Sequence, residues 1–174
     1  GADTGSVRPG DEIAQRFPNV YCSVGTHPHH ADEEDGIAAA ELIELARHPK
    51  VVALGEAGLD NFYDNGSPEA QERGFRAHIA AARATGLPLV IHTRDADEAC
   101  GRVLDDEMAK GPFRAVLHCY TGGRELALKA IGLGLRLPMT WRACEIINAA
   151  SGKPVVELNG ALAAWFSERG LSAQ

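Results

Sequence analysis

The sequence predicts an α/β fold of the (β/α) barrel type, incomplete over its 174 residues. Short apolar runs alternate with segments that carry apolar residues at helical spacing. Continuous apolar strands that alternate with helices are typical of a parallel sheet covered on both faces. Polar residues suited to binding follow the apolar runs at intervals of about one βα unit. A barrel brings successive strand ends to one mouth, whereas an open sheet has its site at a switch point, so these intervals favour the barrel.

Strands and helices are expected in a regular order as far as residue 133: strand 20–24, helix 37–47, strand 51–54, helix 68–86, strand 87–91, helix 95–110, strand 115–117 and helix 125–133. The strands are short runs rich in β-branched and other apolar residues. Turn and cap signals bound the helices. Ser67 and Pro68 form an N-cap and a first-turn proline, and Gly86 and Gly111 end helices.

The alternation fails after Gly132, although 133–140 could form one strand and 155–167 one helix. A complete barrel of eight βα units needs about 200 residues or more, and this chain shows about five clear units. No internal repeat, low-complexity segment or second domain is recognisable. We therefore interpret residues 1–174 as a single barrel domain that is poorly patterned from about residue 135.

The composition is that of a soluble globular domain. Hydrophobic residues make up 45% of the chain and charged residues 24%, and 17 basic against 24 acidic side chains give a net charge of −7. These values exclude a disordered chain, and the longest apolar runs are too short to cross a membrane. The negative charge argues against broad attraction to nucleic acid, unless metal ions supply the positive charge.

The four cysteines lie far apart and form no CxxC pair. Their spacing fits neither a zinc ribbon nor a disulfide-dense secreted domain. No signal peptide is recognisable at the start of the sequence. We therefore expect reduced thiols in a cytoplasmic protein.

Glu56, His92 and His118 each come directly after a predicted strand. Imidazole and carboxylate together suit Zn²⁺, Mn²⁺ or related divalent ions. A lone histidine at a strand end is more often a hydrogen-bonded structural residue. Three such residues at one edge of the sheet favour a metal site.

Three histidines fall within the four residues from His27 to His30, just after the first predicted strand. They could bind metal, or the loop could simply order itself through side-chain hydrogen bonds. We expect His27 to line a site and His30 to lie at the surface. Arg94 follows His92 closely, and its planar guanidinium suits either a phosphate or an ion pair at the barrel mouth. His78 lies on the apolar stripe of its helix and is expected in the core.

Five runs together resemble the TatD family of metal-dependent deoxyribonucleases, which are amidohydrolase-like barrels. They keep the family's order and cover roughly residues 17 to 134: Val24–His29, Ala53–Asp60, Gln71–Phe75, Leu87–Ala96 and Val116–Gly122. A match to any one run would be weak, but five linked runs are a strong signal.

The resemblance implies a TIM-type barrel with two divalent metal ions, such as Mg²⁺, Mn²⁺ or Zn²⁺. In it, Glu56 resembles the catalytic carboxylate that bridges both ions, and His92 and His118 resemble ligands of one ion. His27 and Arg94 would lie near the substrate phosphate. Two ions can activate a water molecule and stabilise both the attacking and the leaving oxygen of a phosphodiester. The implied activity is hydrolysis of DNA, as single strands or at strand ends.

Two family features are missing from this sequence. No His-x-His motif precedes Val20, and no aspartate follows Asp106 to complete the site. Either parts of a normal enzyme lie outside this sequence, or the protein is a truncated relative with an incomplete centre. Two other functions stay open: hydrolysis of D-aminoacyl-tRNA or another ester on the same fold, and a catalytically defective barrel that only binds metal.

Overall fold

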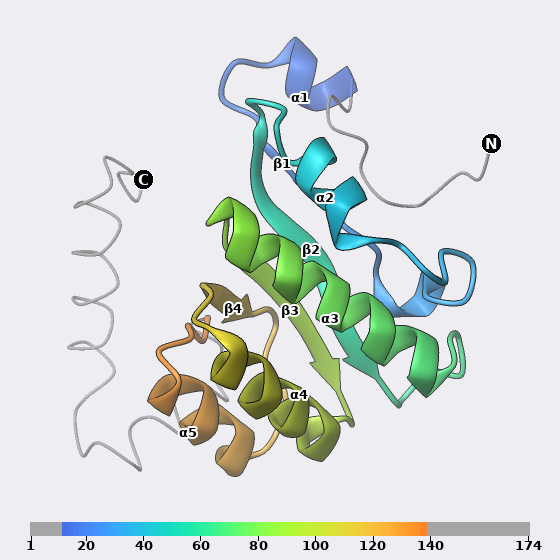
Figure 1. Cartoon of the computed structure of the whole chain (residues 1–174), viewed down its shortest axis with the longest axis vertical. Coiled ribbons are helices and arrows are strands. Elements are labelled where there is room, and N and C mark those ends of the chain that lie inside the picture. The colour runs from blue at the N-terminus through green and yellow to red at the C-terminus, as the bar shows by residue number, and fades with distance from the viewer. Residues whose placement is uncertain (1–11, 139–174) are drawn as a thin grey trace.

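The computed structural model describes residues 12–138, which fold around a four-stranded parallel sheet (Figure 1). The strands are β1 (Cys22–Val24), β2 (Val51–Asp60), β3 (Leu89–Arg94) and β4 (Ala115–Leu117). Their spatial order, β1-β2-β3-β4, follows their order along the chain. Parallel strands in chain order, joined through helices, are the arrangement of consecutive strands in a (β/α) barrel. The α/β fold with a parallel sheet is therefore confirmed, as an incomplete barrel.

The helices of the described part are α1 (Glu12–Arg16), α2 (Ala39–Leu45), α3 (Pro68–Thr85), α4 (Asp97–Lys110) and α5 (Arg124–Gly132), with a short 3-10 helix, η1 (Pro28–His30). Neighbouring helices from α2 to α5 contact one another, and α3 packs on β2 (Figure 1). No helix among the described residues is long and apolar enough to cross a bilayer.

Helix α3 shows how closely local sequence sets its ends. The Ser67 side chain accepts a hydrogen bond from the Ala70 backbone N–H at 3.4 Å, and Gly86 ends the helix with a left-handed φ of 72°. Between these caps, Phe75, His78 and Ile79 lie on the buried face. Phe75 and Ile79 belong to the same buried apolar cluster as strand residues such as Leu54, Ile91 and Leu117.

Strands β2 and β3 extend further toward their carboxyl ends than the sequence predicts. The prediction ends one strand at residue 54, because Gly55 and Glu56 look like a break. In the structure the pairing with β3 continues from Ala57 opposite Ile91 to Asp60 opposite Arg94. Glu56 and His92 therefore lie within the carboxyl-terminal halves of these strands, not after them.

The expected strand at 133–140 is wrong over the part that the structure describes. There, Leu133 follows α5 as its C-cap, and Arg136 forms a single parallel bridge to Val116. The remainder of that segment, and the helix expected at 155–167, lie outside the described residues.

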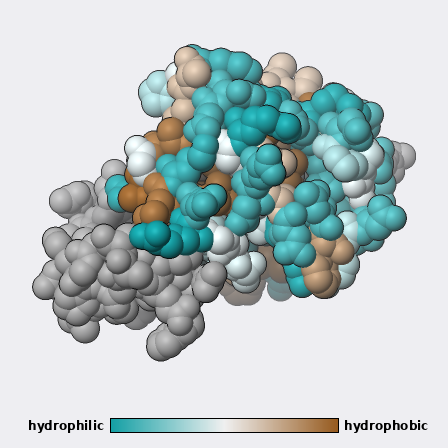
Figure 2. Space-filling model, turned by 90° about the horizontal axis from the view of Figure 1, so that it is seen from below, coloured by the Kyte–Doolittle hydropathy of each residue, from teal (hydrophilic) through white to brown (hydrophobic). Residues whose placement is uncertain are grey.

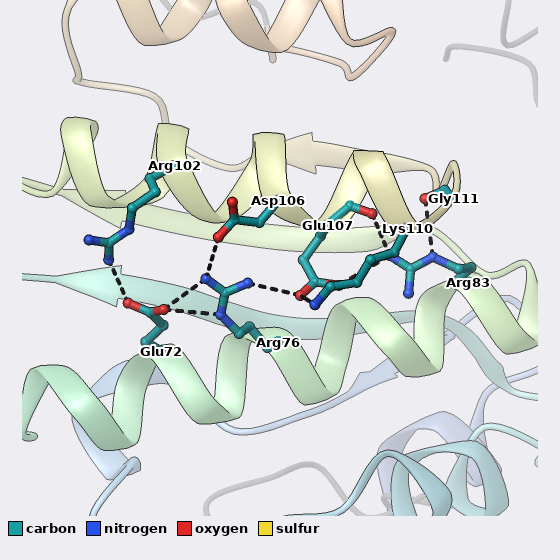
Figure 3. Close-up of polar contacts among 8 residues, drawn as sticks. All are labelled: Glu72, Arg76, Arg83, Arg102, Asp106, Glu107, Lys110 and Gly111. Atoms are coloured by element: carbon teal, nitrogen blue, oxygen red, sulfur yellow. Dashed lines mark hydrogen bonds and ion pairs between the residues drawn. The ribbon is translucent and has the colours of Figure 1, made fainter.

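Polar contacts between their side chains bridge α3 and α4 (Figure 3). The Arg76 guanidinium donates hydrogen bonds to Glu72 on its own helix, and to Asp106 and Glu107 on α4. Arg83 and Lys110 also contact Glu107. Hydrophilic residues cover most of the described surface in the view from below (Figure 2).

Candidate metal centre

The candidate metal centre forms where the carboxyl ends of β1, β2 and β3 come together. Alternate residues of a strand share a face, so Glu56, Gly58 and Asp60 lie on one face of β2. Gly58 pairs with His92 on β3, which brings the His92 side chain to the same face. A Cβ atom on Gly58 would lie 1.9 Å from the His92 carbonyl oxygen. Glycine at this position therefore permits the close approach of the two strands that carry the site.

His92 lies between two carboxylates. Its Nδ1 atom is 3.1 Å from Oε1 of Glu56, and its Nε2 atom is 2.8 Å from Oδ2 of Asp60. The same Oδ2 atom is 2.9 Å from Nε2 of His29, which belongs to η1. Burial opposes protonation of His92, but its hydrogen bonds to Glu56 and Asp60 outweigh burial and raise its pKa.

Asp60 is a buried carboxylate with a full set of partners. Its Oδ1 atom accepts hydrogen bonds from the backbone N–H groups of Phe62 and Tyr63, each at 3.0 Å. Burial acts to raise its pKa, but these backbone bonds and the contacts with His29 and His92 lower the pKa to about 2. Asp60 is therefore ionised at neutral pH, and it fixes the orientation of two imidazole rings.

Gln71 of α3 holds the backbone of Asp60 in place. Its Oε1 atom accepts from the Asp60 N–H at 2.7 Å. Its Nε2 atom donates to the Asp60 carbonyl at 3.1 Å and to the Gly66 carbonyl at 2.7 Å. Because Gln71 is buried, this amide links α3 rigidly to the end of β2.

His27 begins η1 and faces the other histidines. Its Nδ1 atom accepts a hydrogen bond from the His29 N–H at 3.2 Å, and its ring centre is 4.6 Å from that of His92. Burial, together with the positive charges of His92 and His29, lowers the pKa of His27 to about 4. The ring is therefore neutral at pH 7, as a metal ligand or a neutral hydrogen-bonding group must be.

The His27 loop is supported from the core by His78. The Thr26 N–H donates to Nε2 of His78 at 3.0 Å, and Nδ1 of His78 lies 2.7 Å from the Gly74 carbonyl. Both ring nitrogens are thus used, with Nδ1 carrying the proton. His78 is the core residue that the sequence predicts.

Two groups of side chains in the described part have ligand atoms close enough to hold a metal ion. One consists of His27, Glu56 and His92, and the other of His29, Asp60 and His92; within each group the ligand atoms lie within 4.8 Å of one another. Imidazole with carboxylate is a donor set that suits Zn²⁺ and Mn²⁺. The residues present therefore fit a divalent ion, with His92 common to both groups.

The structure brings together Glu56 and His92 of the predicted ligands, and it adds His27 to them. His118 follows β4 at the same edge of the sheet, is exposed, and has its Nε2 atom 3.1 Å from Sγ of Cys119. Neither group includes His118. It is still near enough to act on Glu56, whose pKa is lowered by the hydrogen bond from His92 and, against burial, by the charges of His118 and the other histidines.

Arg94 lies at the end of β3, and its guanidinium stacks on two aromatic rings. Its Cζ atom is 3.8 Å from the centre of the Phe62 ring and 4.9 Å from that of Tyr63. No ion pair joins Arg94 to another residue within 12–138. The sequence left open whether Arg94 binds a phosphate or forms an ion pair at the barrel mouth. Among the described residues it forms no such ion pair.

The sequence interpretation missed Asp60 and did not single out His29 among the three histidines of its loop that could bind metal. The signal for Asp60 was its spacing of four residues from Glu56, which places both carboxylates on one face of a strand. That signal is visible only if the strand continues through Gly55, and it was predicted to stop there. His29 shares a loop with His27, and sequence alone does not say which histidine of a loop turns inward.

Comparison with known proteins gives a consistent result. The family model described as TatD related DNase matches residues 1–147. The chain is 35% identical over 134 residues to the 3'-5' ssDNA/RNA exonuclease TatD of Escherichia coli K12, covering 77% of this chain and 51% of that protein. It is 33% identical over 161 residues to a metal-dependent hydrolase, YabD, of Bacillus subtilis, covering 90% of this chain and 61% of that protein. The chain thus spans about half the length of the TatD relatives that it matches.

Solved structures show the same fold. A TatD homologue from Escherichia coli, YJJV, superposes with a TM-score of 0.64 at 23% identity, covering 78% of this chain and 56% of that one. A TatD family hydrolase from Entamoeba histolytica gives a TM-score of 0.62 at 22% identity, covering 79% and 50%. Family model, sequence relatives and fold agree, and the chain therefore belongs to the TatD-related DNase family.

Proposed function

We propose that this protein hydrolyses phosphodiester bonds of DNA with the help of divalent metal ions, acting on single strands or strand ends. The observation that carries the proposal is the group formed by His27, Glu56 and His92, with Asp60 on the far side of His92. The relative from Escherichia coli is named as a 3'-5' ssDNA/RNA exonuclease, which supports a nucleic-acid substrate. The names of the relatives favour neither D-aminoacyl ester hydrolysis nor a defective barrel.

Glu56, His92 and His27 would hold a metal ion, and we assign His118 as a further ligand from the predicted motif. A bound divalent ion supplies an activated water molecule and stabilises negative charge on the phosphate oxygens. The chain itself has a net charge of −7. Positive charge from metal ions would therefore offset the repulsion between this protein and a polyanionic substrate.

The chain's own residues orient the site. Asp60 holds the Nε2 side of His92, so that Nδ1 faces Glu56. Such a carboxylate fixes both the tautomer and the plane of a ligating imidazole. Without a metal ion, Nδ1 of neutral His27 accepts from the His29 N–H, and Nε2 carries the proton. To bind a metal ion through Nε2, the ring would shift its proton to Nδ1 and release this bond. In this proposal Arg94, which pairs with Asp60 across β2 and β3, lies near the substrate phosphate.

We also place this activity in the cytoplasm. Cys22, Cys100 and Cys119, the cysteines in the described part of the chain, are free thiols. Free thiols persist in a reducing compartment. Nucleic acid is present there as well.

The test is hydrolysis of end-labelled single-stranded DNA by the 174-residue chain in Mn²⁺, Mg²⁺ and Zn²⁺, with EDTA as the blank. We expect metal-dependent cleavage that Glu56→Gln reduces at least about a hundredfold, because the carboxylate would be lost from the metal site. Glu69→Gln is the matched control, since Glu69 is an exposed glutamate in the first turn of α3. Equal cleavage by the wild type and Glu56→Gln would show that the site is wrongly assigned.

A metal titration tests the site without relying on turnover. Calorimetry with Mn²⁺ should show binding by the wild type and by Glu69→Gln, and much weaker binding by Glu56→Gln and His92→Ala. Comparison of His118→Ala with these variants decides whether His118 is a ligand. Unchanged affinity in His118→Ala would remove it from the site.

A further inference from the structure

We propose that Phe62 and Tyr63, with Arg94 behind them, form a platform on which a nucleobase of the substrate stacks, one nucleotide away from the metal centre. We call Phe62 and Tyr63 the aromatic pair. This inference rests on the proposed function and adds a binding site for the base to a mechanism that so far concerns only the phosphate.

The aromatic pair is exposed although its rings are large and apolar. Phe62 is 53% exposed and Tyr63 is 45% exposed. Their rings lie edge to face with centres 4.8 Å apart. Exposed aromatic side chains are the usual surfaces on which proteins stack unpaired bases, because every base offers a flat π-face.

Arg94 makes the aromatic pair part of a layered stack. Its guanidinium lies 3.8 Å from the centre of the Phe62 ring and 4.9 Å from that of the Tyr63 ring. A cation over an aromatic ring holds the ring in place and is itself held there. The pair is thus preorganised, so that binding a base would cost less side-chain entropy.

The aromatic pair is fixed directly to the metal centre. The backbone N–H groups of Phe62 and Tyr63 both donate to Oδ1 of Asp60, whose Oδ2 atom contacts His29 and His92. The Tyr63 ring also lies 5.2 Å from the His29 ring, edge to face. A phosphate held at the metal centre would therefore place its neighbouring base at the aromatic pair.

The space beside the aromatic pair is suitable for a base. Phe62 and Tyr63 line a cavity of about 520 Å³ between the loop after β2 and the first turns of α3 and α4. Volumes of this order are typical of small-ligand sites. The charged groups of the cavity include Glu72 and Arg102, which pair with each other at 2.7 Å, and the carboxylate of Asp64. Such a lining disfavours a phosphate and favours the amino groups of a neutral base.

The test is a double-mutant cycle in which the aromatic pair is removed from the protein and the central base is removed from the ligand. Phosphorothioate trinucleotides, which keep their charge and resist hydrolysis, are bound in Mn²⁺ with either a normal or an abasic central nucleotide. Binding is measured by competition against a trinucleotide that carries a fluorescent dye at one end, whose anisotropy rises on binding whether or not a base stacks. The trinucleotides are tested with deoxyribose and with ribose, because stacking of the same base should not depend on the sugar.

We expect the wild type to bind the abasic trinucleotide about tenfold more weakly than the normal one. The double variant Phe62→Ala/Tyr63→Ala should lose this preference and bind both like an abasic ligand, whereas Phe62→Tyr should keep it. Phe17→Ala is the matched control, since Phe17 is 51% exposed and lies before β1.

The platform is wrong if the wild type does not distinguish the two ligands, or if the double variant weakens both by the same factor. Equal weakening would indicate a structural or phosphate-binding role for the loop. The proposed function is tested separately, by measuring whether the wild type cleaves ordinary phosphodiester DNA. Cleavage without base preference would overturn the platform alone, and base preference without cleavage would overturn the proposed function alone.

Discussion

The Nε2 atom of His92 lies 2.8 Å from Oδ2 of Asp60, across the boundary between strands β3 and β2. Asp60 is buried and ionised, and it has no freedom to turn away because its other oxygen accepts two backbone hydrogen bonds. The pair therefore sets the plane of the His92 ring before any metal binds. Such preorganisation by a carboxylate behind a ligating histidine strengthens metal binding.

Gly58 should tolerate no side chain. A Cβ atom there would lie 1.9 Å from the His92 carbonyl oxygen, and the φ of 150° is in a region that L-residues rarely adopt. We expect Gly58→Ala to lower the free energy of unfolding by about 3 kcal/mol or more, or to prevent folding. Gly74→Ala is the opposite case, because nothing lies within 4 Å of the added Cβ inside α3. It should stabilise the protein by about 0.5–1 kcal/mol in urea denaturation.

Gln71 should be a positioning residue for the metal centre. Gln71→Ala would leave the Asp60 N–H group without its buried partner, which costs about 1–3 kcal/mol in the free energy of unfolding. Displacement of Asp60 should also weaken Mn²⁺ binding roughly tenfold, as measured by calorimetry. Glu69→Ala, on the exposed side of the same helix, is the control. A loss of stability with unchanged Mn²⁺ affinity would limit Gln71 to a structural role.

His78 should make stability depend on pH. Burial lowers its pKa from 6.5 to about 4, even though the bond to the Gly74 carbonyl acts in the other direction. Between these two values the unfolded chain binds a proton that the folded chain excludes. The contribution of His78 to the free energy of unfolding should therefore be constant above pH 6.5. It should decrease as the pH drops toward 4, by roughly 3 kcal/mol at most.

Denaturation of His78→Gln at the same pH values checks this expectation. Glutamine offers an acceptor for the Thr26 N–H but does not titrate, so the variant should lose most of this dependence. An unchanged slope between pH 6.5 and 4 would assign the pH dependence to other groups.

Neighbouring acids of the α3–α4 network should differ sharply in their contribution to stability. The Glu107 side chain is 3% exposed and pairs with Arg76, Arg83 and Lys110, whereas Asp106 is 51% exposed and, among the described residues, pairs with Arg76 alone (Figure 3). We expect Glu107→Gln to cost about 2 kcal/mol in the free energy of unfolding at pH 7 and Asp106→Asn about 0.5 kcal/mol.

The effect of Glu107 should also fade in acid. Burial opposes ionisation, but the hydrogen bonds from Lys110, Arg76 and Arg83 lower the pKa of Glu107 below its ordinary 4.5. Its ionised form therefore stabilises the fold above pH 4.5, and this stabilisation is lost as the pH falls through the lower folded value. Equal costs for the two variants at pH 7 would show that burial does not distinguish these acids.

Several features of the fold could be predicted because they depend on neighbours in the sequence. The caps at Ser67 and Gly86 and the buried stripe of α3 appear where the sequence places them. Strand β4 covers the predicted residues 115–117. The ends of β2 and β3 could not be predicted, because parallel pairing between residues far apart in the chain, such as Asp60 and Arg94, overrides the local break at Gly55.

The sequence by itself determined the family and the alternation of strand and helix, and it named Glu56, His92 and His27 among the candidate site residues that the structure brings together. These follow from residue type and from spacing along one chain. Only the tertiary structure decided that Asp60 and His29 join them, that His118 lies outside both ligand groups, and that Arg94 stacks on Phe62. The reason is physical: those contacts depend on the register between β2 and β3 and on the course of two loops, and both are set by packing across the sheet.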